Sequence, residues 1–396
     1  LELSIGRQLS RERSNRLTHD YNALSLQYDK INKEQTSDFM NTANFTTAGI
    51  KMHSRRRKVS YSFGASWQHV LLEGKIIART EDSVIARRFN NILPEMRVQY
   101  NLSRMNNLSL TYNTQTMQPQ LSQLQPVPDI SRLPDVKLGN PGLKQQFTHA
   151  LSLNFTKVEI FKGKSLFALV SFNQTGNKIA SYDSTSNTGI RYSRPVNVNG
   201  VYDIMARTGM GMRAPFIDGQ LRFSMHGAYS HDKQFSNGKE NLVNIVRLGP
   251  SLAIDLYPGE KTAITLAASL DISLANYSLQ PALAAKYLVQ AYDVAVDCEL
   301  PYHFYFNTGF TYTLNSRRSA EFNSQVPLWN VSLSKQLLKH HRGELKLNIN
   351  DLLNQNTGIS QSASQNFIEY RETMALRRFI LLSFTYNLSK TGLAKN

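Results

Sequence analysis

Residues 151–156 read Leu151-Ser152-Leu153-Asn154-Phe155-Thr156, an alternation of one apolar and one polar side chain. Successive side chains of a β-strand point to opposite faces of its sheet, so this stretch has one apolar and one polar face. The same alternation runs through residues 108–113 and 345–350, and a helical period is almost absent between such stretches. One large closed sheet, apolar outside and polar inside, explains this pattern, which is typical of a transmembrane β-barrel.

The composition agrees with a membrane protein that spans by strands. Of the 396 residues 41% are hydrophobic, yet no run approaches the ~20 apolar residues of a membrane helix. Only helices and closed barrels satisfy their backbone in lipid, so a spanning form of this chain has to use strands. Aromatic residues make up 10% of the chain and would supply girdles at the two lipid interfaces.

The net charge of +16 has two interpretations. It indicates an anionic partner, such as nucleic acid or the phosphates of lipopolysaccharide, or it reflects basic residues on solvated turns and in a wet lumen. We favour the second and expect no nucleic-acid partner. The densest basic cluster, Arg55-Arg56-Arg57-Lys58, lies between two alternating stretches, where a turn is expected. The single cysteine, Cys298, excludes a disulfide framework and a thiolate metal cluster.

The alternation predicts about seventeen strands in this chain. They cover residues 1–9, 17–29, 42–54, 58–72, 89–103, 107–116, 146–156, 164–177, 196–212, 219–231, 242–256, 262–276, 283–296, 301–315, 327–336, 343–352 and 372–389. Short and long connections alternate between them, and only the connection near residues 277–282 departs from this order. Bacterial barrels have short turns on the periplasmic rim and long loops outside. The last strand and the first strand should therefore both run toward the periplasm.

The strand count predicts that further chain precedes Leu1. Seventeen is odd, whereas bacterial single-chain barrels have an even number of strands, so an odd number of upstream strands is expected. The sequence begins Leu1-Glu2-Leu3-Ser4, without an initiator methionine or a signal peptide. We expect residues 1–396 to be the C-terminal part of a single outer-membrane β-barrel domain.

Two segments carry family-like motifs. In residues 93–155 a strand, a turn and a strand precede a long loop with Leu124-x-Pro126, Pro128-Asp129 and Gly139-Asn140-Pro141-x-Leu143, before the chain re-enters a strand at Phe147. Asn-Pro suits a turn, because proline fixes its own φ and pushes the preceding residue out of the helical region. Near the C-terminus, Asn350-Asp351-Leu352-Leu353-Asn354-Gln355 ends a strand, and Arg377-Arg378-Phe379 opens the last one.

These segments resemble the C-terminal β-barrel of TonB-dependent outer-membrane receptors of the Bacteroidota type. The motif residues that carry the resemblance are Gly139, Asn140, Pro141, Leu143, Asp351, Asn354 and Gln355. The resemblance implies a barrel of about 22 strands, an N-terminal plug and a TonB-binding segment, and neither of the last two is visible here. It also implies energised import of a nutrient across the outer membrane of a Gram-negative bacterium.

The partners that follow are outer-membrane lipid and lipopolysaccharide, TonB through the missing N-terminal region, and, as a further candidate, a surface lipoprotein that binds substrate. No enzyme activity, cofactor or metal site is expected. His340-His341 lies in a predicted turn beside Lys339 and Arg342, where neighbouring cations oppose metal binding. The motifs His-Glu-x-x-His and Gly-x-Ser-x-Gly and a phosphate-binding loop are absent from the sequence. Asp183 in residues 183–187 is a weak candidate for binding calcium, and a flexible polar loop is the favoured interpretation.

The candidate functional surface is the rim with the long loops, 117–145, 178–195 and 353–371. These loops either contact ligand or a partner, or only shield the top of the barrel. In the first of them, five polar side chains are candidates for hydrogen bonds to a sugar or peptide: Gln118, Gln120, Gln123, Gln125 and Asp129. Arg97, Gln99, Arg222 and His226 should line the lumen, provided that the register is not shifted by one residue.

Three functions remain open from the sequence. The first is the barrel of a TonB-dependent receptor for nutrient uptake with an unknown ligand. The second is a non-transporting outer-membrane barrel that acts as an assembly or secretion partner. The third is a soluble β-rich carbohydrate-binding module, which the sorted loops and the outward-facing Leu, Phe and Tyr side chains oppose, because a soluble protein with that surface would aggregate.

Overall fold

The computed structural model describes residues 1–32, 36–76, 83–125, 128–281, 284–316, 324–338, 341–356, 359–363, 368–372 and 376–387. Its main feature is one sheet of 20 strands, of which β8, β9, β12 and β13 belong to long loops. The remaining 16 strands of the described residues form a continuous antiparallel wall. In order, they are β1 (Glu2–Arg16), β4 (Ser37–Arg56), β5 (Val59–Ile76), β6 (Ser83–Asn101), β7 (Asn106–Met117), β10 (Gln146–Glu159), β11 (Lys164–Gly176), β14 (Val201–Ala214), β15 (Gly219–Ser236), β16 (Lys239–Leu256), β17 (Thr262–Tyr277), β18 (Ala285–Leu300), β19 (Phe304–Ser316), β20 (Ser324–Leu337), β21 (Gly343–Asn350) and β24 (Phe379–Tyr386).

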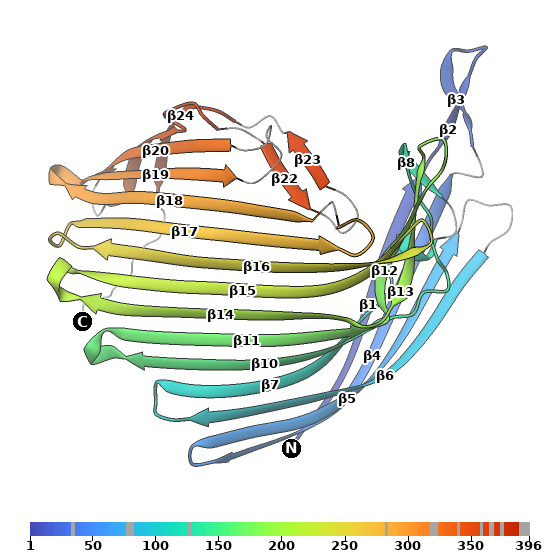
Figure 1. Cartoon of the computed structure of the whole chain (residues 1–396), viewed down its shortest axis with the longest axis horizontal. Coiled ribbons are helices and arrows are strands. Elements are labelled where there is room, and N and C mark those ends of the chain that lie inside the picture. The colour runs from blue at the N-terminus through green and yellow to red at the C-terminus, as the bar shows by residue number, and fades with distance from the viewer. Residues whose placement is uncertain are drawn as a thin grey trace.

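The wall is curved, and its strands run side by side from β1 to β24 (Figure 1). Its connections add short elements. They are β2 (His19–Asn22), β3 (Gln27–Ile31), α1 (Leu121–Leu124), β8 (Asp129–Arg132), β9 (Asp135–Lys137), η1 (Ile160–Lys162), β12 (Lys178–Thr185), β13 (Arg191–Val198), η2 (Pro215–Ile217), η4 (Pro301–His303), β22 (Ile359–Ala363) and β23 (Ile368–Glu372). No helix within the described ranges is long and apolar enough to cross a bilayer.

The wall has one apolar and one polar face, as the alternation predicts. Leu151 of β10 stands opposite Phe172 of β11, and the next residue, Ser152, stands opposite Ser171. Leu151 and Leu153 are 41% and 43% exposed although they are apolar. This pattern is that of a barrel wall, in which the apolar face meets lipid and the polar face lines the interior.

Short and long connections lie on opposite rims, as predicted (Figure 1). The rim at the left of the figure carries tight turns such as residues 57–58 and the 3₁₀ turns η1, η2 and η4. The rim at the right carries the β2–β3, β12–β13 and β22–β23 hairpins. The last strand, β24, runs toward the short-turn rim, which agrees with the predicted direction. The basic cluster Arg55–Lys58 does form the β4–β5 turn, and Arg57 there has φ 46°.

The predicted strand 17–29 is wrong as a wall strand. These residues form the separate β2–β3 hairpin, which projects beyond the long-loop rim (Figure 1). The strand predicted at residues 1–9 extends to Arg16 and pairs directly with β4, with Arg16 opposite Ser37. Leu1–Leu9 therefore runs toward the long-loop rim, against the prediction. The described residues therefore contribute 16 strands to the wall, where the alternation predicted seventeen.

The other differences concern the long loops. The predicted strand 196–212 is interrupted at Asn199-Gly200, where Gly200 has φ 82°, so its first residues end β13 and the rest form β14. The predicted loop 178–195 is mostly the β12–β13 hairpin. The predicted loop 117–145 contains α1, β8 and β9, and the predicted loop 353–371 contains β22 and β23. His340, named above as a turn residue, lies outside the described residues.

Candidate functional site: the mouth of the barrel

The long loop 118–145 is packed against the polar face of the wall. Leu124 and Leu143 are 3% and 2% exposed, and they share one buried cluster with Ala43 of β4 and with Val70 and Leu72 of β5. Val70 and Leu72 point to the same face as Ser62 and Gln68, because all four occupy even positions of β5. The loop is therefore anchored inside the long-loop end of the barrel by apolar contacts.

The Gly-Asn-Pro-x-Leu motif makes this anchoring possible. A Cβ atom on Gly139 would overlap the backbone carbonyl of Gln125, so only glycine permits this close approach. Asn140 donates from Nδ2 to the Pro195 carbonyl at 2.9 Å, and its Oδ1 accepts the Gly142 N–H at 3.0 Å. Leu143 then completes the apolar cluster.

An arginine side chain of the wall also holds this loop. Arg87 of β6 donates from Nε to the Pro141 carbonyl at 2.9 Å, and its Nη2 donates to the same oxygen. The motif thus ties the loop to β6 and, through Asn140, to the β12–β13 hairpin. The motif residues that the sequence identified in this loop therefore have a structural role, because their contacts hold the loop against the wall and the hairpin.

The second motif is also a structural turn. Asp351 is buried, and its two carboxylate oxygens accept the N–H groups of Gln355 at 3.0 Å and Asn356 at 2.9 Å. Asn354 has φ 57°, and its Oδ1 accepts the Arg378 N–H at 3.2 Å. These bonds fix how the chain leaves β21 and how it enters the region before β24.

Loop strands extend the sheet above the wall. The β12–β13 hairpin pairs in parallel with β15, where Tyr182 stands opposite Phe235, and with β9, where Arg191 stands opposite Asp135. Arg191 Nη2 lies 2.9 Å from the Asp183 carboxylate and Nη1 lies 3.5 Å from Asp135. Burial lowers the pKa of Arg191, but the hydrogen bonds and charges of Asp183 and Asp135 outweigh it and hold the pKa above its ordinary value.

Asp183, the residue considered above for calcium binding, is part of this ion pair. Its carboxylate accepts from Arg191 and from the Ser181 hydroxyl, at 2.5 Å, so its charge is already compensated by protein groups. No cluster of three or more His, Cys, Asp or Glu side chains that would suit a metal ion occurs among the described residues. Cys298 is a free thiol.

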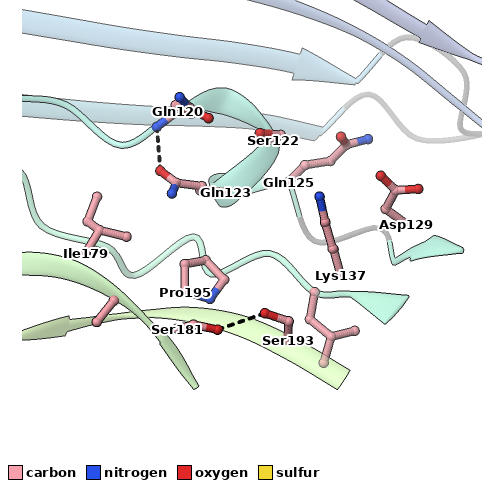
Figure 2. Close-up of a pocket in the computed structure, with 12 residues that line it drawn as sticks. Gln120, Ser122, Gln123, Gln125, Asp129, Lys137, Ile179, Ser181, Ser193 and Pro195 are labelled. Carbon is pink, nitrogen blue, oxygen red and sulfur yellow. Dashed lines mark hydrogen bonds between the residues drawn. The ribbon is translucent and has the colours of Figure 1, made fainter. Parts of the chain in front are cut away.

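A polar pocket of about 300 Å³ lies between α1 and the β8–β9 and β12–β13 strands (Figure 2). Four of the five loop residues predicted from the sequence line it: Gln120, Gln123, Gln125 and Asp129. The fifth, Gln118, does not; its Nε2 donates to Thr116 at 3.4 Å. Asp129 Oδ1 accepts the Ser131 N–H at 3.1 Å, which orients its carboxylate.

Sequence reasoning missed the other side of this pocket. Its polar residues there are Lys137, Ser181 and Ser193, and its apolar lining is Leu138, Ile179, Ala180 and Pro195. Ser122 of α1, on the side of the glutamines, was also not predicted. Most of the residues on the other side come from β9 and from the β12–β13 hairpin, which are distant in sequence from α1. Only the pairing of loop strands brings them together, and the sequence carries no local signal for that pairing.

The four predicted lumen residues do face the polar side of the wall, but away from this pocket. Arg97 and Gln99 line a separate cavity of about 500 Å³ near the short-turn rim, together with Lys51, His53 and Arg55. Lys51 there pairs with Glu95 at 3.0 Å. The predicted residues are therefore divided between the two ends of the barrel interior and its middle.

The polar face of β15, β16 and β17 carries two cross-strand ion pairs, one near the short-turn rim and one farther toward the middle of the strands. Arg222 of β15 binds Asp255 of β16 through two bonds, Nε to Oδ2 at 2.5 Å and Nη2 to Oδ1 at 2.8 Å. His226 lies 3.2 Å from Asp271, and its ring covers Gly249 on the neighbouring strand. Arg222 and His226 therefore lie on the same polar face as these carboxylates, and both side chains contact neighbouring strands.

A wall with an apolar outer face and a polar interior, loops sorted by rim and a loop folded into the mouth together define an outer-membrane β-barrel. The chain belongs to the outer membrane protein beta-barrel family, whose model matches residues 2–386. It is thus a protein of the outer membrane, and the soluble carbohydrate-binding module considered above is excluded. No curated protein matches the chain.

Two solved structures that align with this chain are distant from it in sequence. A variant of the ferric enterobactin receptor PfeA from Pseudomonas aeruginosa, in complex with enterobactin, aligns with a TM-score of 0.43 and 13% identity over 97% of this chain and 60% of its own. A FadL homologue from Pseudomonas aeruginosa aligns with a TM-score of 0.28 and 7% identity, over 97% of this chain and 88% of its own. This chain spans about 60% of the length of the receptor.

Proposed function

We propose that this chain is the barrel of a TonB-dependent outer-membrane receptor that imports a nutrient. The observation that carries the proposal is the loop 118–145, which is anchored inside the mouth by Leu124 and Leu143 and encloses a polar pocket there. A barrel that only anchored a partner would have no need for a loop packed into its own interior. In this function the protein binds and passes a ligand and performs no covalent chemistry, so no catalytic group or cofactor is required.

The proposal also accounts for the interior of the wall. Polar and charged side chains continue below the pocket, through His226 in the middle to Arg222 and Arg97 near the short-turn rim. A hydrated path of this kind suits a polar solute. Import through it would be driven from the periplasmic side by TonB, through residues that precede this chain in the full protein, and a surface lipoprotein that binds substrate is a further proposed partner.

Energised uptake by whole cells tests this proposal. The strain that carries the full-length gene and a strain with the gene deleted are incubated with a mixture of oligosaccharides and tryptic peptides, and depletion of the medium is followed by mass spectrometry. A protonophore, which removes the energy source for TonB, is added to half of the cultures. We expect at least one component to be depleted only when the gene is present and the protonophore is absent. Gene-dependent depletion that the protonophore leaves unchanged would indicate a passive channel, and no gene-dependent depletion would argue against import.

A further inference from the structure

The pocket at the mouth contains a buried hydrogen-bond donor without an acceptor. Gln125 is 6% exposed, and within the described residues its Nε2 has no hydrogen-bond partner. Buried side-chain amides are normally satisfied, and an NH₂ group can only donate. The partner that Gln125 lacks is therefore an acceptor atom.

A second donor in the same pocket has its orientation fixed by the backbone. The side-chain oxygen of Gln123 accepts the backbone N–H of Gln120 at 2.9 Å (Figure 2). Because a backbone N–H is always a donor, the atom beside it has to be the oxygen of the amide. The NH₂ group of Gln123 is therefore the end that remains available to a ligand.

The third donor is a cation. Lys137 of β9 lines the pocket and is exposed, and Figure 2 shows its ammonium group in the space near Gln125 and Asp129. Among the described residues this ammonium makes no ion pair and no hydrogen bond. In the β8–β9 ladder Lys137 stands opposite Asp129, so one ammonium and one carboxylate lie next to each other.

We propose that this pocket binds a carboxylate group that has a hydroxyl or N–H donor one or two atoms away. Lys137 and Gln125 would hold the two carboxylate oxygens, and Asp129 would accept the neighbouring hydrogen-bond donor. Gln123 lies farther along the pocket, where its NH₂ group would meet another part of the ligand. Donor groups of lysine and glutamine form charge-assisted bonds with a carboxylate, which are stronger than neutral ones. The inference rests on the uptake function proposed above and names its ligand class.

The remaining lining supports an acidic group over a neutral sugar ring. None of the described lining residues is aromatic, so the pocket lacks a flat surface against which a sugar ring stacks. Its volume of about 300 Å³ is at the small end of the ~300–1,000 Å³ of ligand pockets. It suits one charged head group, and the rest of a larger ligand would extend toward the mouth.

Two kinds of nutrient carry such a carboxylate, an acidic oligosaccharide and a peptide. Binding to the purified full-length protein in detergent is measured by saturation-transfer NMR with four probes: trigalacturonate, its neutral counterpart galactotriose, trialanine, and trialanine amide. We expect trigalacturonate or trialanine to bind at least about tenfold more tightly than its neutral counterpart. The charged probe that binds identifies the source. Equal binding of charged and neutral probes, or no binding of either charged probe at millimolar concentration, would overturn the proposal.

Lys137→Gln tests the residue that carries the charge preference. The substitution should remove the preference for the charged probe over its neutral counterpart. Asp129→Asn should weaken binding of the charged probe but leave that preference in place. Lys144→Gln is the matched control, because Lys144 lies in the same loop, is exposed and does not line the pocket. Unchanged preference in Lys137→Gln would contradict the inference. Folding of each variant is checked independently by its heat-modifiable mobility.

The two proposals fail separately. If no charged probe binds but protonophore-sensitive, gene-dependent uptake of a neutral nutrient is observed, the ligand class is wrong and the import function stands. If the charged probe binds with the predicted dependence on Lys137 but no energised uptake occurs, the pocket assignment stands and the import function is wrong.

Discussion

Leu143 and Gly139 show how single residues hold a loop inside a barrel. Leu143 is almost fully buried against Val70, and Gly139 lets the chain pass directly over the carbonyl of Gln125. The sequence indicated that this motif closes a long loop. It did not indicate that these residues hold the loop in place, because their partners are distant in sequence. Arg87 lies 54 residues before Pro141, and Pro195 lies 55 residues after Asn140.

Gly139→Ala should displace the loop from the mouth. The added methyl group would overlap the Gln125 carbonyl, and overpacking of this kind destabilises by ~1–3 kcal/mol or more. We expect faster proteolytic cleavage within residues 118–145 while the wall stays folded. Gly309→Ala is the control, since a Cβ at Gly309 meets nothing within 4 Å. Cleavage at the wild-type rate in Gly139→Ala would show that the loop is not held by this approach.

At the scale of the element, the strands that cross the lipid were predictable and those outside it were not. Within lipid, one face has to be apolar, so the alternation identifies strands such as β10 and β17. Residues 10–16 of β1 are mostly polar on both faces because that part of the strand extends beyond the lipid, and the sequence there suggests a turn. Conversely, the apolar side chains Tyr21, Leu24 and Tyr28 led to the prediction of a wall strand, although they belong to the exposed β2–β3 hairpin.

Replacing residues 17–36 by an Asn-Gly turn should leave the wall intact. Arg16 and Ser37 are cross-strand partners, and a two-residue turn joins such neighbours. The variant should keep the heat-modifiable gel mobility of a folded barrel. The control deletes residues 60–75 from within β5, which lie in the wall, and should abolish that mobility. Loss of mobility in the first variant would mean that residues 17–29 are part of the wall after all.

Asp255→Ala and Arg222→Ala test the ion pair that joins β15 and β16. Their two charge-assisted bonds lie on the polar face, with side-chain exposures of 12% and 52%, so solvent weakens the interaction. A double-mutant cycle on urea unfolding in detergent should give a coupling free energy of about 1 kcal/mol. Additive effects of the two substitutions would show that the pair does not couple the strands.

At the scale of the whole molecule, the fold follows from the alternation, whereas the site depends on contacts between distant loops. The alternation and the sorted connection lengths predicted an outer-membrane barrel, its two kinds of rim and the position of Arg97 and Arg222 on the polar face. The glutamines of one loop were also predictable as polar groups at the mouth. Lys137 and Ser193 were not, because they join the pocket only when β9 pairs with the β12–β13 hairpin.

The alternating wall is tested most directly by a spin-label scan of β10. Single cysteines are placed at residues 151–156 of the full-length protein carrying Cys298→Ser, labelled, and reconstituted in lipid bilayers. Oxygen, which partitions into lipid, and a water-soluble nickel chelate are then compared as relaxing agents. We predict a period of two, with oxygen favoured at residues 151, 153 and 155 and the nickel chelate at 152, 154 and 156. A scan without this period, or with the two sets exchanged, would contradict the barrel.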